Sequence, residues 1–161
     1  MSEAEVVLSA PTAADTRAVG VRLAALVQAG DLIVLDGGLG AGKTTLTQGI
    51  GAGLGVRGEV TSPTFVIARV HRSLTGGPDL VHVDAYRLDG RVELDDLDLD
   101  ADVDHAVTVV EWGLGLAEPL AESFLRVRLE CPDPDANDRV VRVQAVGPRW
   151  KQAPARTSLL A

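Results

Sequence analysis

The chain has 161 residues, of which 46% are hydrophobic, 24% are charged and 3% are aromatic. This length suits one domain, and this balance excludes a disordered or fibrous chain and predicts an aliphatic core. The net charge of −8 disfavours a protein that binds nucleic acid on its own, because neutralising phosphates requires clustered Lys and Arg.

The N-terminal sequence MSEAEVVLSAPTAAD has neither the basic region nor the apolar region of a signal peptide. No apolar run in the chain approaches the ~20 residues that span a bilayer. The single cysteine, Cys131, can form no internal disulfide, which fits a reducing compartment. We therefore expect a soluble, cytoplasmic protein.

The first predicted elements are a helix, a strand and a second helix. Apolar residues recur at helical spacing within residues 11–28, and Thr12 or Asp15 is placed to cap that helix. Residues 32–35 (LIVL) form a short continuous apolar run, which is typical of a strand buried on both faces of a parallel sheet. The second helix is predicted to run from Lys43 to about Leu54.

Further along the chain, apolar runs at residues 65–70, 80–84 and 107–110 predict three more strands. Residues 125–129 and 140–143 alternate or are β-branched, and they predict a closing antiparallel pair. Strands that alternate with helices predict an α/β fold: a single P-loop NTPase-like domain with a largely parallel central sheet, an antiparallel pair near the C-terminus and flanking helices.

The end of the chain lacks such patterns. Residues 148–161 have no periodic apolar face, so we expect a flexible C-terminal tail after one domain over residues 1–147. No linker or internal repeat divides that domain.

The acidic residues are unevenly distributed, since seven of them lie between residues 93 and 104 without a Lys or Arg. The rest of the chain, with 15 basic and 16 acidic residues, is nearly neutral. Asp100, Asp102, Asp104 and Glu111 would match ligand positions of an EF-hand loop, but a histidine stands where its sharp turn needs glycine. We therefore favour an acidic surface exposed to solvent or to a partner.

Residues 37–44 (GGLGAGKT) match the phosphate-loop pattern G-x-x-x-x-G-K-[ST] between a predicted strand and a predicted helix. Glycines let backbone N–H groups cradle phosphate oxygens, and the following helix adds its positive dipole end. Lys43 is expected to reach the β- and γ-phosphates, and the Thr44 hydroxyl to bind Mg²⁺. The pattern thus predicts nucleotide binding; the alternative is a glycine turn that only joins strand to helix.

Two predicted strands end in an acid, Asp84 in one and Glu111 in the other. A phosphate-loop enzyme needs an acid at the end of a neighbouring strand to hold the metal's water shell or to orient the attacking water. Either acid alone could be an ordinary strand-end residue, and the spacing does not say which is functional. The strand period of two places His82 on the same face as Asp84. His71 lies too far from His82 in sequence to argue for zinc, and we expect it to be exposed.

Four motifs in this order resemble the TsaE family: GLGAGKTT at 38–45, SPTF at 62–65, HVDAYRL at 82–88 and EWG at 111–113. The resemblance covers about residues 10–145. It implies a bacterial ATPase required for the N6-threonylcarbamoyl modification of adenosine 37 in tRNAs that read codons beginning with A. It also implies two partner proteins, TsaB and TsaD, which would hold the tRNA and transfer the group, so that this chain meets tRNA only indirectly.

The same resemblance implies roles for individual residues. Lys43, Asp84 and Glu111 would be catalytic, with Asp84 acting on the attacking water. Thr44 and Glu111 would hold Mg²⁺. Trp112 would pack beside the metal site; the alternative is an ordinary aromatic residue of the core at the end of a strand. The ATP-binding residues it implies are Thr16, Leu39, Gly40, Ala41, Gly42, Lys43, Thr44 and Thr45.

Ser62, Pro63 and Thr64 resemble a switch-like loop of the family, in which hydroxyl groups sense the γ-phosphate; an ordinary turn is the alternative. The chain departs from the family at Gly38, where many members have Asp. Two other functions remain open. A small-molecule kinase has the same phosphate loop but needs a lid arginine and an acceptor pocket, and an interaction module would bind ATP with little turnover.

Overall fold

The computed structural model describes residues 5–37, 42–56, 68–84, 105–111, 122–133, 135–136 and 138–150. Within these ranges it contains two α-helices, seven strands and one short 3₁₀ helix. In chain order they are β1 (Glu5–Ala10), α1 (Ala13–Leu26), β2 (Leu32–Asp36), α2 (Lys43–Leu54), β3 (Ala68–His71), β4 (Asp79–Asp84), β5 (Ala106–Glu111), β6 (Phe124–Glu130), β7 (Arg139–Val146) and η3 (Pro148–Trp150).

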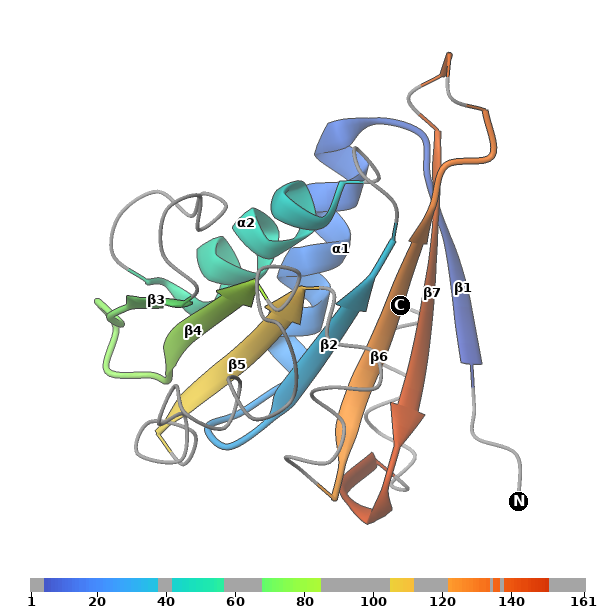
Figure 1. The fold of residues 1–161 in the computed structure, drawn as a ribbon. Helices are drawn as coiled ribbons and strands as arrows, with labels where there is room; N and C mark the ends of the chain where they lie inside the picture. The colour runs from blue at the N-terminus through green and yellow to red at the C-terminus, as the bar shows by residue number, and fades with distance from the viewer. Residues whose placement is uncertain are drawn as a thin grey trace.

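The strands form one mixed sheet in the order β1-β7-β6-β2-β5-β4-β3 (Figure 1). Strands β6, β2, β5 and β4 run parallel to their neighbours in this group. Antiparallel strands complete both edges, with β7 and β1 beyond β6 and β3 beyond β4. The predicted α/β fold with a largely parallel centre and a C-terminal antiparallel pair is therefore confirmed.

Strand β1, the edge strand that precedes α1, was not expected from the sequence. This strand pairs antiparallel with β7, from Glu5 opposite Gln144 to Ala10 opposite Arg139. Its side chains alternate between the two faces, so that Val6 is buried whereas Val7 is exposed. The alternation is that of an edge strand with one face on the core.

The central strands are buried on both faces, as the run LIVL predicted. Ile33, Val34 and Leu35 of β2 are fully buried, and all six residues of β5 are buried. In a parallel sheet the crossover connections cover the faces, so central strands need apolar residues in both directions.

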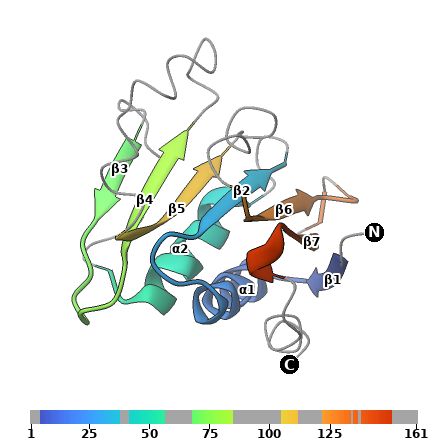
Figure 2. The same ribbon diagram turned by 90° about the horizontal axis from the view of Figure 1, so that it is seen from below.

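Helices α1 and α2 lie on the same face of the sheet (Figures 1 and 2). Helix α1 starts with a capping box, in which Thr12 Oγ1 accepts from the Asp15 N–H at 3.2 Å and Asp15 Oδ2 accepts from the Thr12 N–H at 3.0 Å. The predicted cap is thus confirmed, with both residues taking part. Neither of the α-helices in the described ranges has the length and apolar character needed to cross a membrane.

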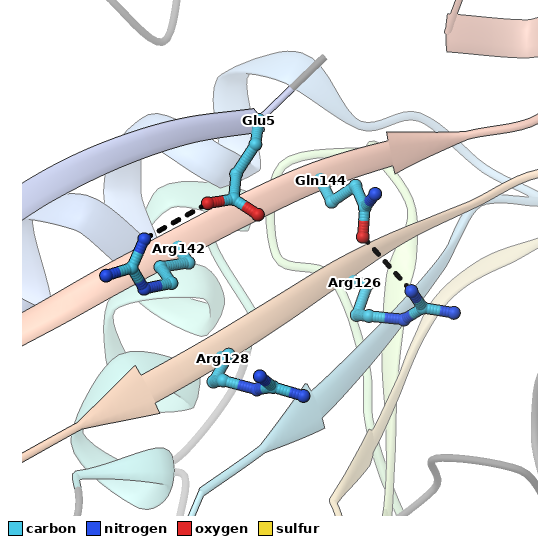
Figure 3. A pocket seen from close by; sticks show the side chains of 5 residues that line it. All are labelled: Glu5, Arg126, Arg128, Arg142 and Gln144. Carbon is cyan, nitrogen blue, oxygen red and sulfur yellow. Dashed lines mark hydrogen bonds and ion pairs between the residues drawn. The ribbon is translucent and has the colours of Figure 1, made fainter. Parts of the chain in front are cut away.

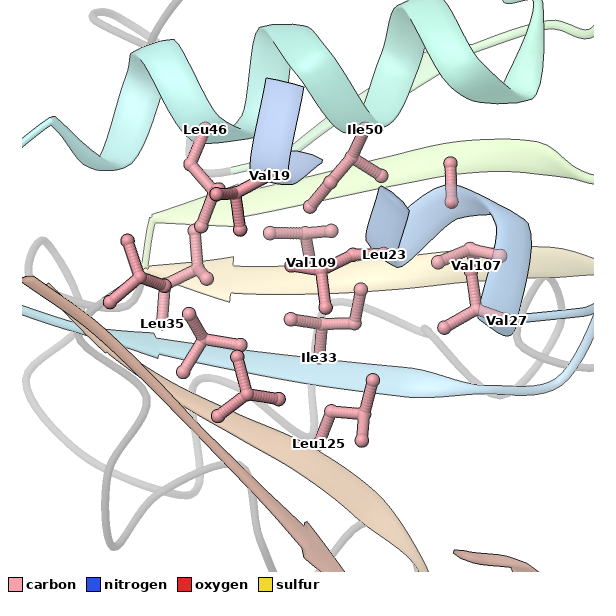
Figure 4. Close-up of a cluster of buried hydrophobic side chains, with 14 of the residues drawn as sticks. Val19, Leu23, Val27, Ile33, Leu35, Leu46, Ile50, Val107, Val109 and Leu125 are labelled. Atoms are coloured by element: carbon pink, nitrogen blue, oxygen red, sulfur yellow. The ribbon is translucent and has the colours of Figure 1, made fainter. Parts of the chain in front are cut away.

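The two helices pack with their backbones in contact. A Cβ atom added to Gly20 of α1 would overlap the carbonyl oxygen of Leu46, and one added to Gly49 of α2 would overlap the carbonyl oxygen of Arg17. The aliphatic core fills the layer between these helices and the sheet (Figure 4), as the low aromatic content predicted. Its labelled members are Val19, Leu23, Val27, Ile33, Leu35, Leu46, Ile50, Val107, Val109 and Leu125.

The folded domain extends past the predicted boundary at residue 147. Residues Pro148–Trp150 form η3, and the Trp150 side chain joins the core at 3% exposure. Arg149 donates two hydrogen bonds to the Asp31 carboxylate, at 3.1 and 3.0 Å, and its guanidinium lies 4.4 Å from the Trp150 ring centre. The expectation that a flexible tail begins at residue 148 is therefore wrong for these three residues, while residues 151–161 lie outside the described ranges.

Candidate functional site

The N-terminus of α2 lies at the C-terminal end of the predicted phosphate loop. Gly42, the residue before the helix, has a left-handed backbone with φ of 104°, a conformation that favours glycine. Because glycine has no side chain, Gly42 cannot cap the first N–H groups of α2. Uncapped N–H groups together with the helix dipole form an anion site suited to phosphate.

Lys43 spans the two described ends of that loop. Its side chain is buried at 7% exposure, and Nζ donates a 2.6 Å hydrogen bond to the carbonyl oxygen of Gly37, the residue after β2. The ammonium group of the first helical residue is thus held beside the end of β2. A positive charge at this position is available to phosphate oxygens that enter the loop.

Thr16 of α1, implied only by resemblance, lies next to the same loop. Its side chain is buried, and its methyl carbon Cγ2 is 3.7 Å from the position of a Cβ built on Gly42. Thr44 and Thr45 are partly buried in the first turn of α2. The structure therefore brings Thr16, Gly42, Lys43, Thr44 and Thr45 together.

Glu111 lies at the carboxyl end of β5, between the two strands that carry the other predicted groups. It is opposite Leu35 of β2 on one side and opposite Asp84 of β4 on the other. Because β2 leads into the phosphate loop, this alignment puts both acidic residues at the carboxyl ends of the parallel strands, where the loop begins. In open α/β sheets, ligands bind at the carboxyl ends of the strands.

The structure reveals a partner of Glu111 that the sequence analysis did not identify. His82 Nε2 and Glu111 Oε2 are 2.9 Å apart, with 0% and 4% of the two side chains exposed. The two residues lie on adjacent parallel strands, where His82 is opposite Val109. The available signal was the strand period, which places His82 on the face of Asp84, but only the pairing of β4 with β5 brings it to Glu111.

The donor set at this edge fits Mg²⁺. The Thr44 hydroxyl and the Glu111 carboxylate are oxygen ligands of the kind that Mg²⁺ prefers. His82 binds Oε2 of Glu111, whereas Oε1 makes no hydrogen bond to the described part of the chain. Within that part, no group of three or more His, Cys, Asp or Glu side chains could hold a metal alone. A metal ion here would share its coordination with phosphate oxygens and water.

Several of the residues with a predicted role lie outside the described part of the chain. These are Leu39, Gly40 and Ala41 of the phosphate loop, the predicted switch residues Ser62, Pro63 and Thr64, Trp112, the acidic stretch at 93–104 and the side chain of Asp84.

His71 is buried, so the expectation that it is exposed is wrong. It ends β3 opposite Leu80 of β4, which is fully buried, and its own exposure is 7%. The neighbouring Arg69 and Val70 are exposed. The sequence next to His71 therefore resembles an exposed segment, although the His71 side chain itself packs inward.

A separate polar hollow of about 250 Å³ lies over β1, β7 and β6 (Figure 3). Its three arginines all have partners: Arg126 binds Gln144, Arg128 binds Asp36, and Arg142 binds both Glu130 and Glu5. The hydrogen bonds from Arg142 to Glu130 and Glu5 raise the pKa of its guanidinium. Carboxylates balance two of these three charges and an amide binds the third, so the described residues of this surface do not form the unpaired basic patch that binds nucleic acid.

Comparisons with known proteins show the family and agree with the fold. A family model described as "Threonylcarbamoyl adenosine biosynthesis protein TsaE" matches residues 10–140. A Streptomyces coelicolor protein named "tRNA threonylcarbamoyladenosine biosynthesis protein TsaE" is 59% identical over 148 residues, which cover 90% of this chain and 99% of the relative. The Bacillus subtilis protein of that name is 36% identical and covers 85% of this chain and 84% of its own.

A solved structure is also similar. The crystal structure of Bacillus subtilis YdiB superposes with a TM-score of 0.78 at 28% identity, and it covers 99% of this chain and 97% of its own. This similarity extends over both helices and the whole sheet rather than over the phosphate loop alone.

Proposed function

This chain belongs to the TsaE family of tRNA threonylcarbamoyladenosine biosynthesis, and from that premise we propose that it hydrolyses MgATP to support N6-threonylcarbamoylation of adenosine 37 in tRNA. The observation that carries the proposal is the start of α2. There Gly42 leaves the helix uncapped, and Lys43 Nζ is held at the Gly37 carbonyl.

Lys43 supplies the charge for this reaction. On nucleotide binding its ammonium group exchanges the Gly37 carbonyl for the β- and γ-phosphate oxygens, and the N–H groups of the loop and of α2 surround the same phosphates. Charge that develops on the transferred phosphoryl group is then met by donors already in place.

Thr44 and Glu111 would hold Mg²⁺, which when bound neutralises negative charge on the phosphates. Asp84, at the same sheet edge as Glu111, would orient the attacking water. Ser62, Pro63 and Thr64 would sense the γ-phosphate and order on it, as loops of other NTPases do. Thr16, beside Gly42, would contact the nucleotide from α1.

The proposal assigns the handling of tRNA to TsaB and TsaD in the cytoplasm, with this chain meeting tRNA only through them. Two observations support this division. The net charge is −8. The arginines on the β6–β7 surface are paired with carboxylates or an amide.

The test is steady-state ATP hydrolysis by the pure protein, alone, with TsaB and TsaD, and with a panel of small-molecule acceptors. We expect slow hydrolysis alone and faster hydrolysis with the partner pair. Phosphate transfer to an acceptor, with hydrolysis unchanged by the partners, would support a kinase instead. Nucleotide binding without turnover in every mixture would support an interaction module.

A further inference from the structure

The buried pair of His82 and Glu111 is the feature from which we draw a further inference. With the two atoms 2.9 Å apart and both side chains almost completely buried, the contact is a direct hydrogen bond shielded from water. When Glu111 is ionised it has no proton to donate, so the proton of this bond lies on Nε2 of His82.

The other ring nitrogen shows where the histidine directs its interactions. Nδ1 of His82 is buried and has no hydrogen-bond partner among the described residues, so Glu111 is the only polar partner of the imidazole there. An unsatisfied buried nitrogen costs about 1–3 kcal/mol, a cost that an apolar residue at this position would avoid. Stability alone therefore does not account for a histidine here.

His82 is too deep in the sheet to act on the nucleotide itself. It lies opposite Val109, two residues before the carboxyl end of β5, and none of its side chain is exposed. Glu111 lies at that end, opposite Leu35 of the strand that leads into the phosphate loop. Any effect of His82 on the site therefore passes through the Glu111 carboxylate.

We propose that His82 is a positioning residue that holds Oε2 of Glu111 and so fixes Oε1 for the nucleotide-bound Mg²⁺. The hydrogen bond removes the freedom of a flexible carboxylate before the ligand arrives, which is how outer partners orient metal-binding side chains in general. This inference rests on the proposed function, since it requires Glu111 to act at a Mg²⁺ site.

Two amide variants of the full chain provide the test. His82→Gln carries its amide nitrogen the same number of bonds from Cα as Nε2, so it can restore the bond to Glu111. His82→Asn is one bond shorter, so it keeps the polarity without the reach. His82→Leu adds a variant without any donor.

The main measurement is the affinity for ADP, titrated calorimetrically with Mg²⁺ present and again with the metal chelated. In His82→Asn and His82→Leu we expect the Mg²⁺ concentration needed for half-maximal tightening of ADP binding to rise about tenfold. His82→Gln is expected to stay close to the wild type. Affinity for metal-free ADP should be unchanged in all three, because the phosphate loop is untouched.

Thermal unfolding of each variant separates positioning from packing. If His82→Asn and His82→Leu lower the melting temperature but bind Mg²⁺ and ADP like the wild type, His82 is only structural and the inference fails. Equal losses of Mg²⁺ response in His82→Gln and His82→Asn would also overturn it. A wild-type protein that binds no MgADP would instead refute the proposed function.

Discussion

Helices α1 and α2 pack against each other, yet their N-termini are built in opposite ways. Each α-helix begins with N–H groups that no residue of the same helix can satisfy. In α1 the side chains of Thr12 and Asp15 complete a capping box. The residue before α2 is Gly42, which has a left-handed backbone and no side chain that could cap the helix.

The difference shows that the two helices of one pair have separate roles: the start of α1 adds stability, and the start of α2 serves the proposed function. The cap of α1 stabilises a helix whose role is to cover the sheet and support its neighbour. In the proposed function, the uncapped start of α2 leaves donors for a phosphate at some cost in stability, and the capped helix that packs against it helps to hold it in place. Four substitutions test this division, beginning with the largest expected effect.

Lys43→Ala should nearly abolish ATP turnover, because the start of α2 loses the charge that meets the transferring phosphate. Such contacts are worth roughly 3–4 kcal/mol of transition-state stabilisation. The measurement is kcat for MgATP hydrolysis, with Arg22→Ala on the exposed face of α1 as the matched loss of a cation. Wild-type turnover in Lys43→Ala would show that the start of α2 has no role in ATP hydrolysis.

Gly49→Ala should reduce the free energy of unfolding by about 1–3 kcal/mol, because the new Cβ would overlap the Arg17 carbonyl and separate the helices. The loss occurs although alanine favours a helix more than glycine does. Urea unfolding measures it. The control is Ala52→Gly, at an exposed position of the same helix, which changes only helix propensity. A Gly49→Ala protein as stable as the wild type would show that the helices do not depend on this contact.

Thr12→Ala should cost about 1 kcal/mol of stability, because α1 loses its cap. Thr12→Ser keeps the hydroxyl and should therefore retain most of the stability that Thr12→Ala loses. The sharper measurement is nucleotide affinity, which we expect to stay at the wild-type value in both variants. A clear loss of affinity in Thr12→Ala would mean that the cap also positions Thr16 at the phosphate loop.

Arg17→Ala should have the smallest effect, at most about 0.5 kcal/mol, since surface substitutions rarely exceed this. Arg17 donates a 3.0 Å hydrogen bond to Gln48 across the helix pair, and the contact is exposed. A double-mutant cycle with Gln48→Ala measures the coupling. A coupling above 1 kcal/mol would show that polar contacts, and not only the close backbones, join the helices.

Local pattern was enough to predict most of the elements, because their signals lie within a few residues. The capping residues of α1, the apolar run LIVL of β2 and the glycine-rich loop before α2 can each be recognised from the local sequence for a physical reason. Strand β1 could not be predicted in this way, since the role of EVVLSA depends on pairing with β7, far along the chain. Trp150 was missed because a single aromatic residue that docks alone forms no period.

The candidate site divides along the same line. Lys43, Thr44 and Gly42 belong to a contiguous motif, so the sequence predicted them together. The contact between His82 and Glu111 joins residues 29 positions apart, and it exists only because β4 lies beside β5 in one register. His82 begins the motif HVDAYRL, yet nothing in that segment identifies Glu111 as its partner.

The pairing of β1 with β7 also sets an order of events during synthesis. Strand β1 leaves the ribosome before its partner β7, and Glu5 can meet Arg142, which is 137 residues later, only after β7 has emerged. The parallel strands that carry the phosphate loop and Glu111 can assemble before then. Until β7 emerges, Val6 has no sheet to cover it and the β1 backbone remains an open template for other chains. The emergence of β7, and not the assembly of the parallel strands, is therefore the event that protects β1.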